Sequence, residues 1–529
     1  MRERDFQKPG RSVAISGKAM AATSHPSATL AAIDILRSGG NAVDAAVCAV
    51  ALQCVIDPLM TGIGGDCFAM IAPTGRSPVA INGSGRAPAA ASAAALRARG
   101  LSAIDVESPD AVTVPGCIDA WTHIVAGYGR LPLDAILAPA IAAAEQGFCV
   151  TPRIAFDWER HQSRVRRHPP ALQHYLPAGR PPRTGEIFVQ PALAATLRRI
   201  AAQGRDGFYR GPVAREMAEV LQSVGGVHSE GDFAGYKCFE TAPISARYRD
   251  YDLLECPPNG QGLAALLILR ILDGFDFADP SYGEADRIHL LAEATKLAYA
   301  MRDRVICDPG SAEVDIDAIL SEETVARLRA RVDMARAAAS GPWEGPTHKD
   351  TVYVTVVDEA GNAVSLINSV FDSFGSGIYA PESGVLLHNR GAGFSLKEGH
   401  PNELAGGRLP FHTIIPAMLM KDGLPVMSFG VMGAHYQAVG HAHILSQMID
   451  LGLDPQQANE APRSFCHDGV LTLETTIGED VRAELEKRGH VTRRAEEPIG
   501  GCQAIWIDRE RGILLGASDH RKDGVALGL

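Results

Sequence analysis

The pattern of hydrophobic and polar positions is most distinctive between residues 351 and 368. Two runs rich in β-branched residues, 351–357 and 363–368, flank the pair Gly361-Asn362. Such runs on either side of a Gly-Asn turn are typical of a β-hairpin. The first run begins abruptly after a polar segment that contains proline and glycine, 341–346. We therefore predict a strand that begins at Thr351.

Helices and strands are interspersed through the rest of the chain. Ser27 can cap a helix over 28–38, which Gly39 would end. The next helix begins within 39–46 and runs to about 55; it is apolar on nearly all faces, so we expect it inside a large core. We expect a helix that follows 112–116 and ends near 128, one at 135–146, one that follows 208–211 and ends at 224, and one that begins within 257–262 and ends near 272. Helices are also expected at 290–304 and 316–339, and further strands at 13–23, 67–72 and 79–82.

Composition narrows the class of protein. The 529 residues are 46% hydrophobic and 21% charged, which indicates two to four ordinary globular domains or one large packed unit. The net charge is −12 and no long basic run occurs, so nucleic acid is not an expected partner. The ten cysteines lack C-x-x-C spacing, and we expect buried thiols rather than a zinc site or a disulfide framework.

The sequence contains no segment that we expect to enter a membrane. The first nine residues have no apolar stretch of the signal-peptide type. No run approaches the roughly 18 apolar residues that indicate a membrane-spanning helix. We therefore expect a cytoplasmic protein.

Thr351 has two interpretations. A threonine at the start of a strand is most often only a good strand former. If the chain were cut between Asp350 and Thr351, however, Thr351 would carry a free α-amine, which titrates near pH 8. That amine can take the proton of the threonine hydroxyl and make it a nucleophile without a histidine.

Many short segments in one register resemble the γ-glutamyltransferases (glutathione hydrolases), a family of N-terminal-nucleophile hydrolases. The resemblance extends from about Gly17 over nearly the whole chain and favours the nucleophile interpretation of Thr351. The matching segments are 62–66, 112–116, 129–133, 350–351, 358–365, 374–378 and 382–387.

The resemblance implies a fold and a processing event. The fold would be α/β (α+β), a four-layer α/β/β/α sandwich with two stacked, mainly antiparallel sheets. Self-cleavage of one precursor would yield a large chain, 1–350, and a small chain, 351–529, which form one packed heterodimer. Whether the heterodimer assembles further into a homo-oligomer is left open.

The resemblance also implies catalytic positions. Ser369 stands where the family has a second threonine that orients the nucleophile, and it keeps the hydroxyl. Gly433 and Ala434 stand where the family has the glycine pair for the oxyanion. They lie in a glycine-rich segment that leads from a strand into a helix, an arrangement that exposes backbone N–H groups to an anion. The three histidines 435, 441 and 443 do not have metal-ligand spacing.

The expected substrate pocket departs from the family. Phe371 replaces an asparagine, Arg390 a glutamine, and Gly393 the aspartate that takes the substrate ammonium, while His412 and Thr413 replace a serine pair. Without that aspartate a buried ammonium is costly. Arg390 offers instead a planar fork for a carboxylate.

Arg86 lies near the position of a family arginine that pairs with the substrate α-carboxylate. The alignment places Ser84 at that position and Arg86 two residues late. Two roles of Arg86 therefore stay open. It could be a ligand for the substrate, or a solvated or structural arginine.

Together these features predict an acyl-enzyme hydrolase or transferase that needs no metal or cofactor and acts on a small-molecule amide, γ-glutamyl or otherwise carboxylated. We expect hydrolysis to dominate because segment 394–408 is shorter than in relatives with a lid. The alternatives are an amidase for an oxamate or cephalosporin side-chain type of amide, and an uncleaved binding homologue.

Overall fold

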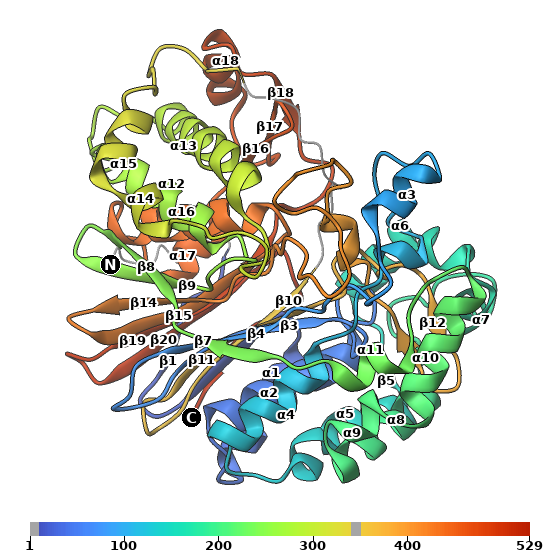
Figure 1. The fold of residues 1–529 in the computed structure, drawn as a ribbon. Coiled ribbons are helices and arrows are strands. Elements are labelled where there is room, and N and C mark those ends of the chain that lie inside the picture. The colour runs from blue at the N-terminus through green and yellow to red at the C-terminus, as the bar shows by residue number, and fades with distance from the viewer. Residues whose placement is uncertain (1–9, 340–350) are drawn as a thin grey trace.

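The computed structural model describes residues 10–339 and 351–529. Two seven-stranded sheets stack at the centre, and helices cover both outer faces (Figure 1). All strand pairs within these two sheets are antiparallel. The predicted four-layer α/β/β/α sandwich is confirmed.

Each large sheet combines strands from distant parts of the chain. The first sheet runs β1 (Ala14–Ser16), β20 (Ile513–Ser518), β19 (Gly501–Asp508), β15 (Leu424–Met432), β14 (Ala417–Lys421), β9 (Tyr251–Glu255) and β8 (Ile244–Tyr248). The second sheet runs β21 (Val525–Gly528), β2 (Met20–Thr23), β10 (Val352–Val357), β11 (Ala363–Ser369), β3 (Asp66–Ala72), β4 (Val79–Gly83) and β7 (Phe239–Thr241).

The segments before and after residue 351 are interleaved within these sheets. Strand β2 lies between β21 and β10, and β3 lies beside β11. In the first sheet, β9 pairs with β14. Neither segment therefore contains all the strands of either large sheet.

Strand β10 is buried on both faces. Val352, Val354 and Val356 belong to the core between the second sheet and its helices, while Tyr353 belongs to the core between the two sheets. The tyrosine ring packs against Gly430 of β15, where a Cβ would lie 2.3 Å from the ring. Burial on both faces explains why this strand is a continuous apolar run rather than an alternating one.

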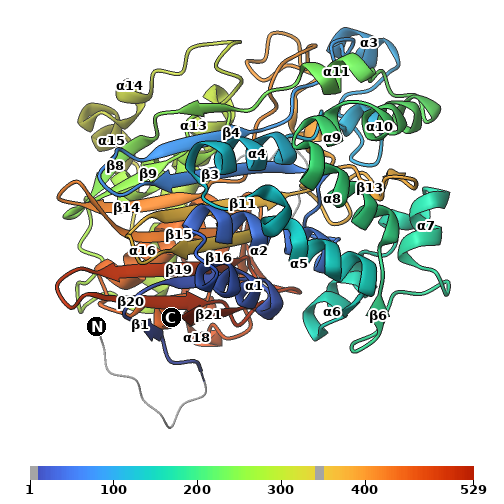
Figure 2. The ribbon, with the colours of Figure 1, turned by 90° about the horizontal axis from the view of Figure 1, so that it is seen from below.

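Helices α1, α2 and α4 pack on the second sheet (Figure 2), and α12, α16 and α17 pack on the first. The helices near the second sheet or beyond it are α1 (Pro26–Arg37), α2 (Ala42–Ile56), α3 (Ala93–Ala98), α4 (Cys117–Tyr128), α5 (Leu133–Gln146), α6 (Pro152–His161), α7 (Pro169–Tyr175), α8 (Pro191–Gln203), α9 (Asp206–Tyr209), α10 (Pro212–Ser223) and α11 (Glu230–Gly235). The others are α12 (Gly262–Leu272), α13 (Glu284–Val305), α14 (Ile316–Leu320), α15 (Glu322–Arg329), α16 (Tyr436–Ile449), α17 (Pro455–Glu460) and α18 (Glu479–Lys487).

Smaller elements complete the fold. A three-stranded sheet lies beside α13 and α18, and two short hairpins lie elsewhere. Their strands are β16 (Ser464–His467), β17 (Val470–Leu473), β18 (Thr492–Arg494), β12 (Tyr379–Ala380), β13 (Val385–Leu386), β5 (Phe148–Cys149) and β6 (Ile187–Phe188). None of the described helices has the length and hydropathy needed to cross a membrane.

The N-terminal elements differ from the prediction in two ways. The predicted strand 13–23 is two strands in different sheets, because the chain crosses from one sheet to the other between β1 and β2. The first helix is capped by His25, not Ser27, and begins at Pro26. Nδ1 of His25 accepts the N–H of Ser27 at 3.2 Å, and proline suits the first helical position because it needs no donor there.

The predicted long helix at 316–339 was also wrong. Two short helices, α14 and α15, occupy only its first part. Ser321 separates them, because its Oγ accepts the N–H of Thr324 at 3.3 Å and so starts a new helix. Residue 350 of the predicted cleavage site lies outside the described residues.

Candidate active site

Thr351 lies immediately before β10, and its side chain is almost fully buried. The β10–β11 register pairs Val352 with Asn368, so the next pair outward brings Thr351 beside Ser369. Oγ1 of Thr351 lies 3.3 Å from Oγ of Ser369. The hairpin therefore brings together two hydroxyl groups that are 18 residues apart in the sequence.

Ser369 is held on two sides. Its Oγ accepts the N–H of Phe371 at 2.9 Å. Its backbone packs against Gly65, where a Cβ would lie 2.3 Å from the carbonyl oxygen of Ser369. Gly65 therefore permits close backbone approach next to the hydroxyl pair, which is a packing role.

A left-handed turn connects β15 to α16. Gly433 has φ +116° and Ala434 has φ +54°, and α16 follows from Tyr436. A Cβ at Gly433 would lie 2.9 Å from the Cα of Gly500. Backbone conformation and space both favour glycine here, and the turn lies at the N-terminus of a 14-residue helix, whose dipole favours negative charge.

Gln261, which precedes α12, and two residues of α13 support this turn. Nε2 of Gln261 donates to the carbonyl oxygens of Ala434 at 2.9 Å and Thr413 at 2.8 Å. Nη1 of Arg302 donates to Oε1 of Gln261 at 2.9 Å. The hydroxyl of Tyr299 donates to the carbonyl oxygen of His435. These side chains fix the turn and the neighbouring 412–413 segment relative to each other.

A buried charged cluster, consisting of Asp66, His388, Arg390 and His412, lies beside the hydroxyl pair. Asp66 pairs with Ser369 in the β3–β11 register. Oδ2 of Asp66 lies 3.0 Å from Nε2 of His412, 3.2 Å from Nδ1 of His388 and 3.3 Å from Nε of Arg390. All four side chains are fully buried, so their charges interact in a low-dielectric environment.

The charge states of the cluster follow from burial and contacts. Burial would raise the pKa of Asp66, but the contacts with His388 and His412 hold it well below its usual range. Burial lowers the pKa of Arg390 to about 10, so the guanidinium stays charged at neutral pH. Burial and the Arg390 cation lower the pKa of His412 to about 3. His412 is therefore neutral, with Nε2–H donating to Asp66 while Nδ1 accepts the N–H of Ile414.

Arg390 lies at the centre of the predicted substrate-binding residues. Nη1 donates to Oγ1 of Thr413 at 2.9 Å, and the guanidinium lies 4.1 Å above the ring of Phe371. Nη2 is buried and has no hydrogen-bond partner among the described residues. The structure thus brings Arg390, His412, Thr413 and Phe371 together around one unsatisfied donor.

Arg86 lies elsewhere. Its side chain is 41% exposed, and Nη1 lies 3.6 Å from Oδ2 of Asp308 and donates to the carbonyl oxygen of Gly407 at 2.9 Å. It lines a separate surface pocket of about 460 Å³. Ser84, at the aligned position, is buried and accepts from Nδ2 of Asn259 at 3.1 Å. The described contacts of Arg86 are those of a structural arginine.

A larger pocket, of about 590 Å³, opens at the left-handed turn. Gly433 and His435 line it on one side, and Asp372, which follows Phe371, also reaches it. Its remaining wall includes both cations and carboxylates, among them Arg153 and Glu497. A pocket of this volume can admit a small ligand directly beside the turn.

Some residues at this site were not singled out by the sequence. Segment 62–66 matches the family and a helix was predicted at 290–304, but nothing in either pattern marked Asp66, Tyr299 or Arg302 as contacts of the site. A carboxylate at the start of an otherwise apolar strand was the one available signal for Asp66. Its partners come from segments more than 300 residues away.

The sandwich and the hydroxyl pair at the start of a central strand define an N-terminal-nucleophile hydrolase, a class of enzymes that transfer acyl groups. The profile of the family described as gamma-glutamyltranspeptidase matches residues 28–529. The chain belongs to this family, as its sequence pattern predicted.

Similar proteins share nearly the whole chain. A protein named oxamate amidohydrolase proenzyme from Klebsiella pneumoniae is 37% identical over 530 residues, with 97% of this chain and 99% of the relative covered. One named glutathione hydrolase-like YwrD proenzyme from Bacillus subtilis is 35% identical over 527 residues, with 97% and 99% covered. The crystal structure of a cephalosporin acylase from Bacillus halodurans superposes with a TM-score of 0.93 at 37% identity, covering 100% of this chain and 99% of that one.

Proposed function

We propose that this enzyme hydrolyses a small amide whose acyl part carries a carboxylate, with Thr351 as the nucleophile. The observation that carries the proposal is the unsatisfied Nη2 of Arg390, buried next to Thr413 and in contact with Phe371. A buried donor left without a partner costs free energy, and an anionic acceptor removes that cost. Nη2 of Arg390 can therefore donate a charge-assisted hydrogen bond to a substrate carboxylate.

The charge of the cluster supports an anionic acyl group. The negative charge of Asp66 and the positive charge of Arg390 offset each other. Both ring nitrogens of His388 face oxygen acceptors, with Nε2 2.8 Å from the carbonyl oxygen of Thr113 and Nδ1 3.2 Å from Asp66. The Asp66 carboxylate is thus already contacted by His388, His412 and Arg390, so it is not left over for a substrate ammonium, whereas the Arg390 guanidinium keeps one donor for a carboxylate.

The first chemical step is self-cleavage. Oγ1 of Thr351 attacks the carbonyl carbon of Asp350, and the bond from that carbon to the nitrogen of Thr351 breaks, leaving an ester and a free α-amine. Water hydrolyses the ester, which leaves a carboxylate on residue 350. The products are the large chain, 1–350, and the small chain, 351–529, which remain together as a heterodimer.

The catalytic cycle uses the same hydroxyl. The α-amine accepts the proton of Oγ1 as Oγ1 attacks the substrate carbonyl. Backbone N–H groups of Gly433 and Ala434 stabilise the oxyanion, and Ser369 holds Oγ1 in place. The substrate amine leaves with a proton from the α-amine, and water then hydrolyses the acyl-enzyme. The names of the relatives, amidohydrolase, hydrolase-like and acylase, support water as the acceptor.

The acyl preference can be tested with three p-nitroanilides that share a five-carbon acyl chain. Glutaryl carries the carboxylate alone, γ-glutamyl carries the carboxylate and an ammonium, and valeryl carries neither. We expect the glutaryl compound to have the highest kcat/KM. The valeryl compound should be worse by about 10- to 150-fold, which corresponds to one hydrogen bond to a charged group. A γ-glutamyl preference of about tenfold or more would contradict the proposed pocket. Oxamate and a cephalosporin side-chain amide complete the panel.

Gly393→Asp restores the carboxylate that family members use for the substrate ammonium. A Cβ at 393 would lie 3.0 Å from the carbonyl oxygen of Phe411, so the backbone must move by a few tenths of an ångström. The variant should shift preference toward the γ-glutamyl compound by about 1.5–3 kcal/mol. An unchanged ratio in a folded, cleaved variant would show that position 393 does not face the substrate.

Processing and assembly have separate readouts. A denaturing gel should show pieces of roughly 37 and 19 kDa from the 56.1 kDa chain, and the smaller should begin Thr351-Val352-Tyr353. One intact band would favour the uncleaved binding homologue. Gel filtration would measure the oligomeric state, and fractionation of the native host would test the predicted cytoplasmic location.

A further inference from the structure

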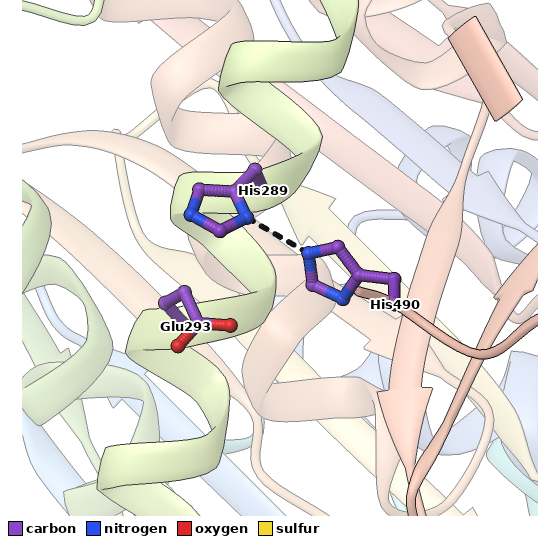
Figure 3. Close-up of side chains that lie close together, drawn as sticks. All are labelled: His289, Glu293 and His490. Atoms are coloured by element: carbon purple, nitrogen blue, oxygen red, sulfur yellow. Dashed lines mark hydrogen bonds between the residues drawn. The ribbon is translucent and has the colours of Figure 1, made fainter. Parts of the chain in front are cut away.

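Two histidines and a glutamate meet outside the proposed active site (Figure 3). His289 and Glu293 lie four residues apart on α13, so they share one face of the helix. His490 follows α18 and precedes β18. One potential ligand atom from each side chain lies within 4.8 Å of the other two, and all three residues are buried.

Hydrogen bonds fix which nitrogen of His289 can bind a metal. Nε2 of His289 lies 2.8 Å from the carbonyl oxygen of Asp333, which can only accept, so Nε2 carries the proton. Nδ1 of a neutral His289 therefore has a free lone pair, and it faces Nε2 of His490 at 2.8 Å. A histidine whose second nitrogen donates to a backbone carbonyl has the arrangement that metal-binding histidines usually have.

We propose that Nδ1 of His289, Nε2 of His490 and one carboxylate oxygen of Glu293 bind a zinc ion, with a fourth position left for water. Two imidazoles and a carboxylate are a ligand set that zinc commonly takes. The sequence pattern did not predict this site, because its two histidines are 201 residues apart and come from different parts of the fold.

Small movements convert the present contacts into a coordination sphere. Zinc–ligand bonds of about 2.0–2.1 Å in a tetrahedron place ligand atoms about 3.4 Å apart. The two histidine nitrogens must separate by roughly 0.6 Å from their 2.8 Å hydrogen bond. The proton between them moves to Nδ1 of His490, which leaves Nε2 free to bind. The carboxylate must approach the ion, which a change of side-chain rotamer can supply.

The charged neighbours are compatible with the ion. Nζ of Lys296 lies 2.7 Å from Oε1 of Glu293 and also donates to the carbonyl oxygen of Ala338 at 2.7 Å. Oε2 of Glu293 accepts the N–H of Ala338 at 3.1 Å. Each carboxylate oxygen has a second lone pair for the metal. Arg488, the other nearby cation, is already paired with Asp286 at 2.8 Å.

The position of the site suggests a structural role. His289, Glu293 and Asp333 belong to the segment before residue 351, and His490 to the segment after it. If the chain is cleaved as proposed above, the ion would connect the two chains. Metal binding itself does not depend on cleavage, so the two proposals can fail independently.

The test uses the full-length protein, with any affinity tag removed, and zinc chloride as the probe. Calorimetric titration and metal analysis after dialysis should give one bound zinc per chain, and zinc should raise the midpoint of thermal unfolding. His490→Gln keeps an amide N–H for the hydrogen bond to His289 but removes the ligand. It should bind zinc about 100-fold more weakly or worse, since even loss of an outer hydrogen-bond partner costs 10- to 100-fold.

His123→Gln is the matched control. His123 also contacts a glutamate, with Nε2 2.9 Å from Oε1 of Glu240, but at a half-exposed surface site. This variant should bind zinc as tightly as the original protein. Glu293→Gln should weaken binding like His490→Gln. Equal zinc affinity and equal thermal shifts in the original protein and in His490→Gln would overturn the proposal, as would the absence of binding in the original protein.

Discussion

The two ends of the candidate active site are built on different principles. At the catalytic end, Thr351 and Ser369 are neutral hydroxyls placed by a strand register, and the turn at Gly433 is shaped by backbone geometry. At the substrate end, Asp66 and Arg390 are charged, fully buried and held by each other. In the function proposed above, the first arrangement would cleave the amide bond of any bound substrate, whereas the second would select which amide is bound. Variants at the two ends should therefore separate self-cleavage from substrate turnover.

The largest effect is expected from Thr351→Ala. The variant should fold but remain a single chain, and turnover should fall by at least about 10⁴-fold, as with other catalytic nucleophiles. Thr355→Ala is a matched control, because Thr355 is a buried threonine of the same strand that donates to Oγ of Ser428 at 2.7 Å. A denaturing gel and a p-nitroanilide assay measure both. A normally cleaved Thr351→Ala protein would show that the catalytic end has been placed wrongly.

Gly433→Ala tests the turn at the catalytic end. Its φ of +116° and the Cα of Gly500 at 2.9 Å disfavour any side chain, so the turn must shift. The shift should move one backbone N–H away from the oxyanion, and kcat should fall by up to about 10²–10³, the effect of losing one donor; self-cleavage should slow as well. Gly423→Ala is the control, since Gly423 has φ +76° with no atom within 4 Å of an added Cβ. It should cost about 1–2 kcal/mol of stability and leave kcat unchanged. Equal kcat values in the two variants would contradict the oxyanion role.

Arg390→Gln should separate the two ends. Self-cleavage should proceed normally, while kcat/KM for the glutaryl anilide should fall by about 10- to 100-fold through KM. Because Asp66 loses a buried partner, the free energy of unfolding should also drop by about 3–5 kcal/mol. Arg86→Gln removes only a half-exposed ion pair and should change kcat/KM by less than about fivefold. A larger loss of kcat/KM in Arg86→Gln than in Arg390→Gln would show that Arg86, not Arg390, binds the substrate carboxylate.

The smallest effect concerns acid stability. His412 has its pKa lowered to about 3 by burial and by Arg390, so the unfolded chain binds a proton that the folded chain does not between about pH 6.5 and 3. Stability should therefore rise with pH across that window, by about 1.4 kcal/mol per pH unit from this group. The depressed pKa of Asp66 acts in the same direction below about pH 4.

Denaturation of the uncleaved Thr351→Ala protein at several pH values measures this slope. Adding His412→Gln should reduce the slope of the free energy of unfolding against pH by about 1.4 kcal/mol per pH unit. Adding Ser369→Ala, at the neutral catalytic end, should leave it unchanged. Equal slopes in all three proteins would contradict a neutral His412.

The contact between Thr351 and Ser369 at the proposed catalytic end could be predicted from the sequence, and the contacts at the proposed substrate end only in part. Thr351 and Ser369 belong to one hairpin, whose turn and apolar runs determine the register. The turn at Gly433 likewise lies within one strand–turn–helix segment. Arg390, His412 and Thr413 were recognised as departures from the family pattern, and the structure places them together. Asp66, which joins them, could not be recognised, because its contacts depend on how β3 lies relative to segments 388–390 and 412.

The sequence could not supply the directions and contacts of Arg86, Tyr299 and Arg302 either, because they also depend on tertiary packing. Arg86 is one residue from Gly85, whose N–H donates to Oδ1 of Asp66 at 2.9 Å, yet its side chain points to a different pocket. Closeness in the sequence predicts that two residues lie near each other, but it does not predict the direction in which their side chains point. Tyr299 and Arg302 reach the turn because α13 packs against α16, which no local pattern reports.

The interleaving of β2 between β21 and β10 has a consequence for the lifetime of the cleaved enzyme. Separation of the two chains would break the backbone hydrogen bonds on both sides of β2. It would also expose the core between the two sheets. The activation barrier for dissociation should then approach that for global unfolding, so chains would not exchange between molecules on the timescale of turnover. Mixing isotopically labelled and unlabelled enzyme should leave the two populations unmixed until the protein is denatured.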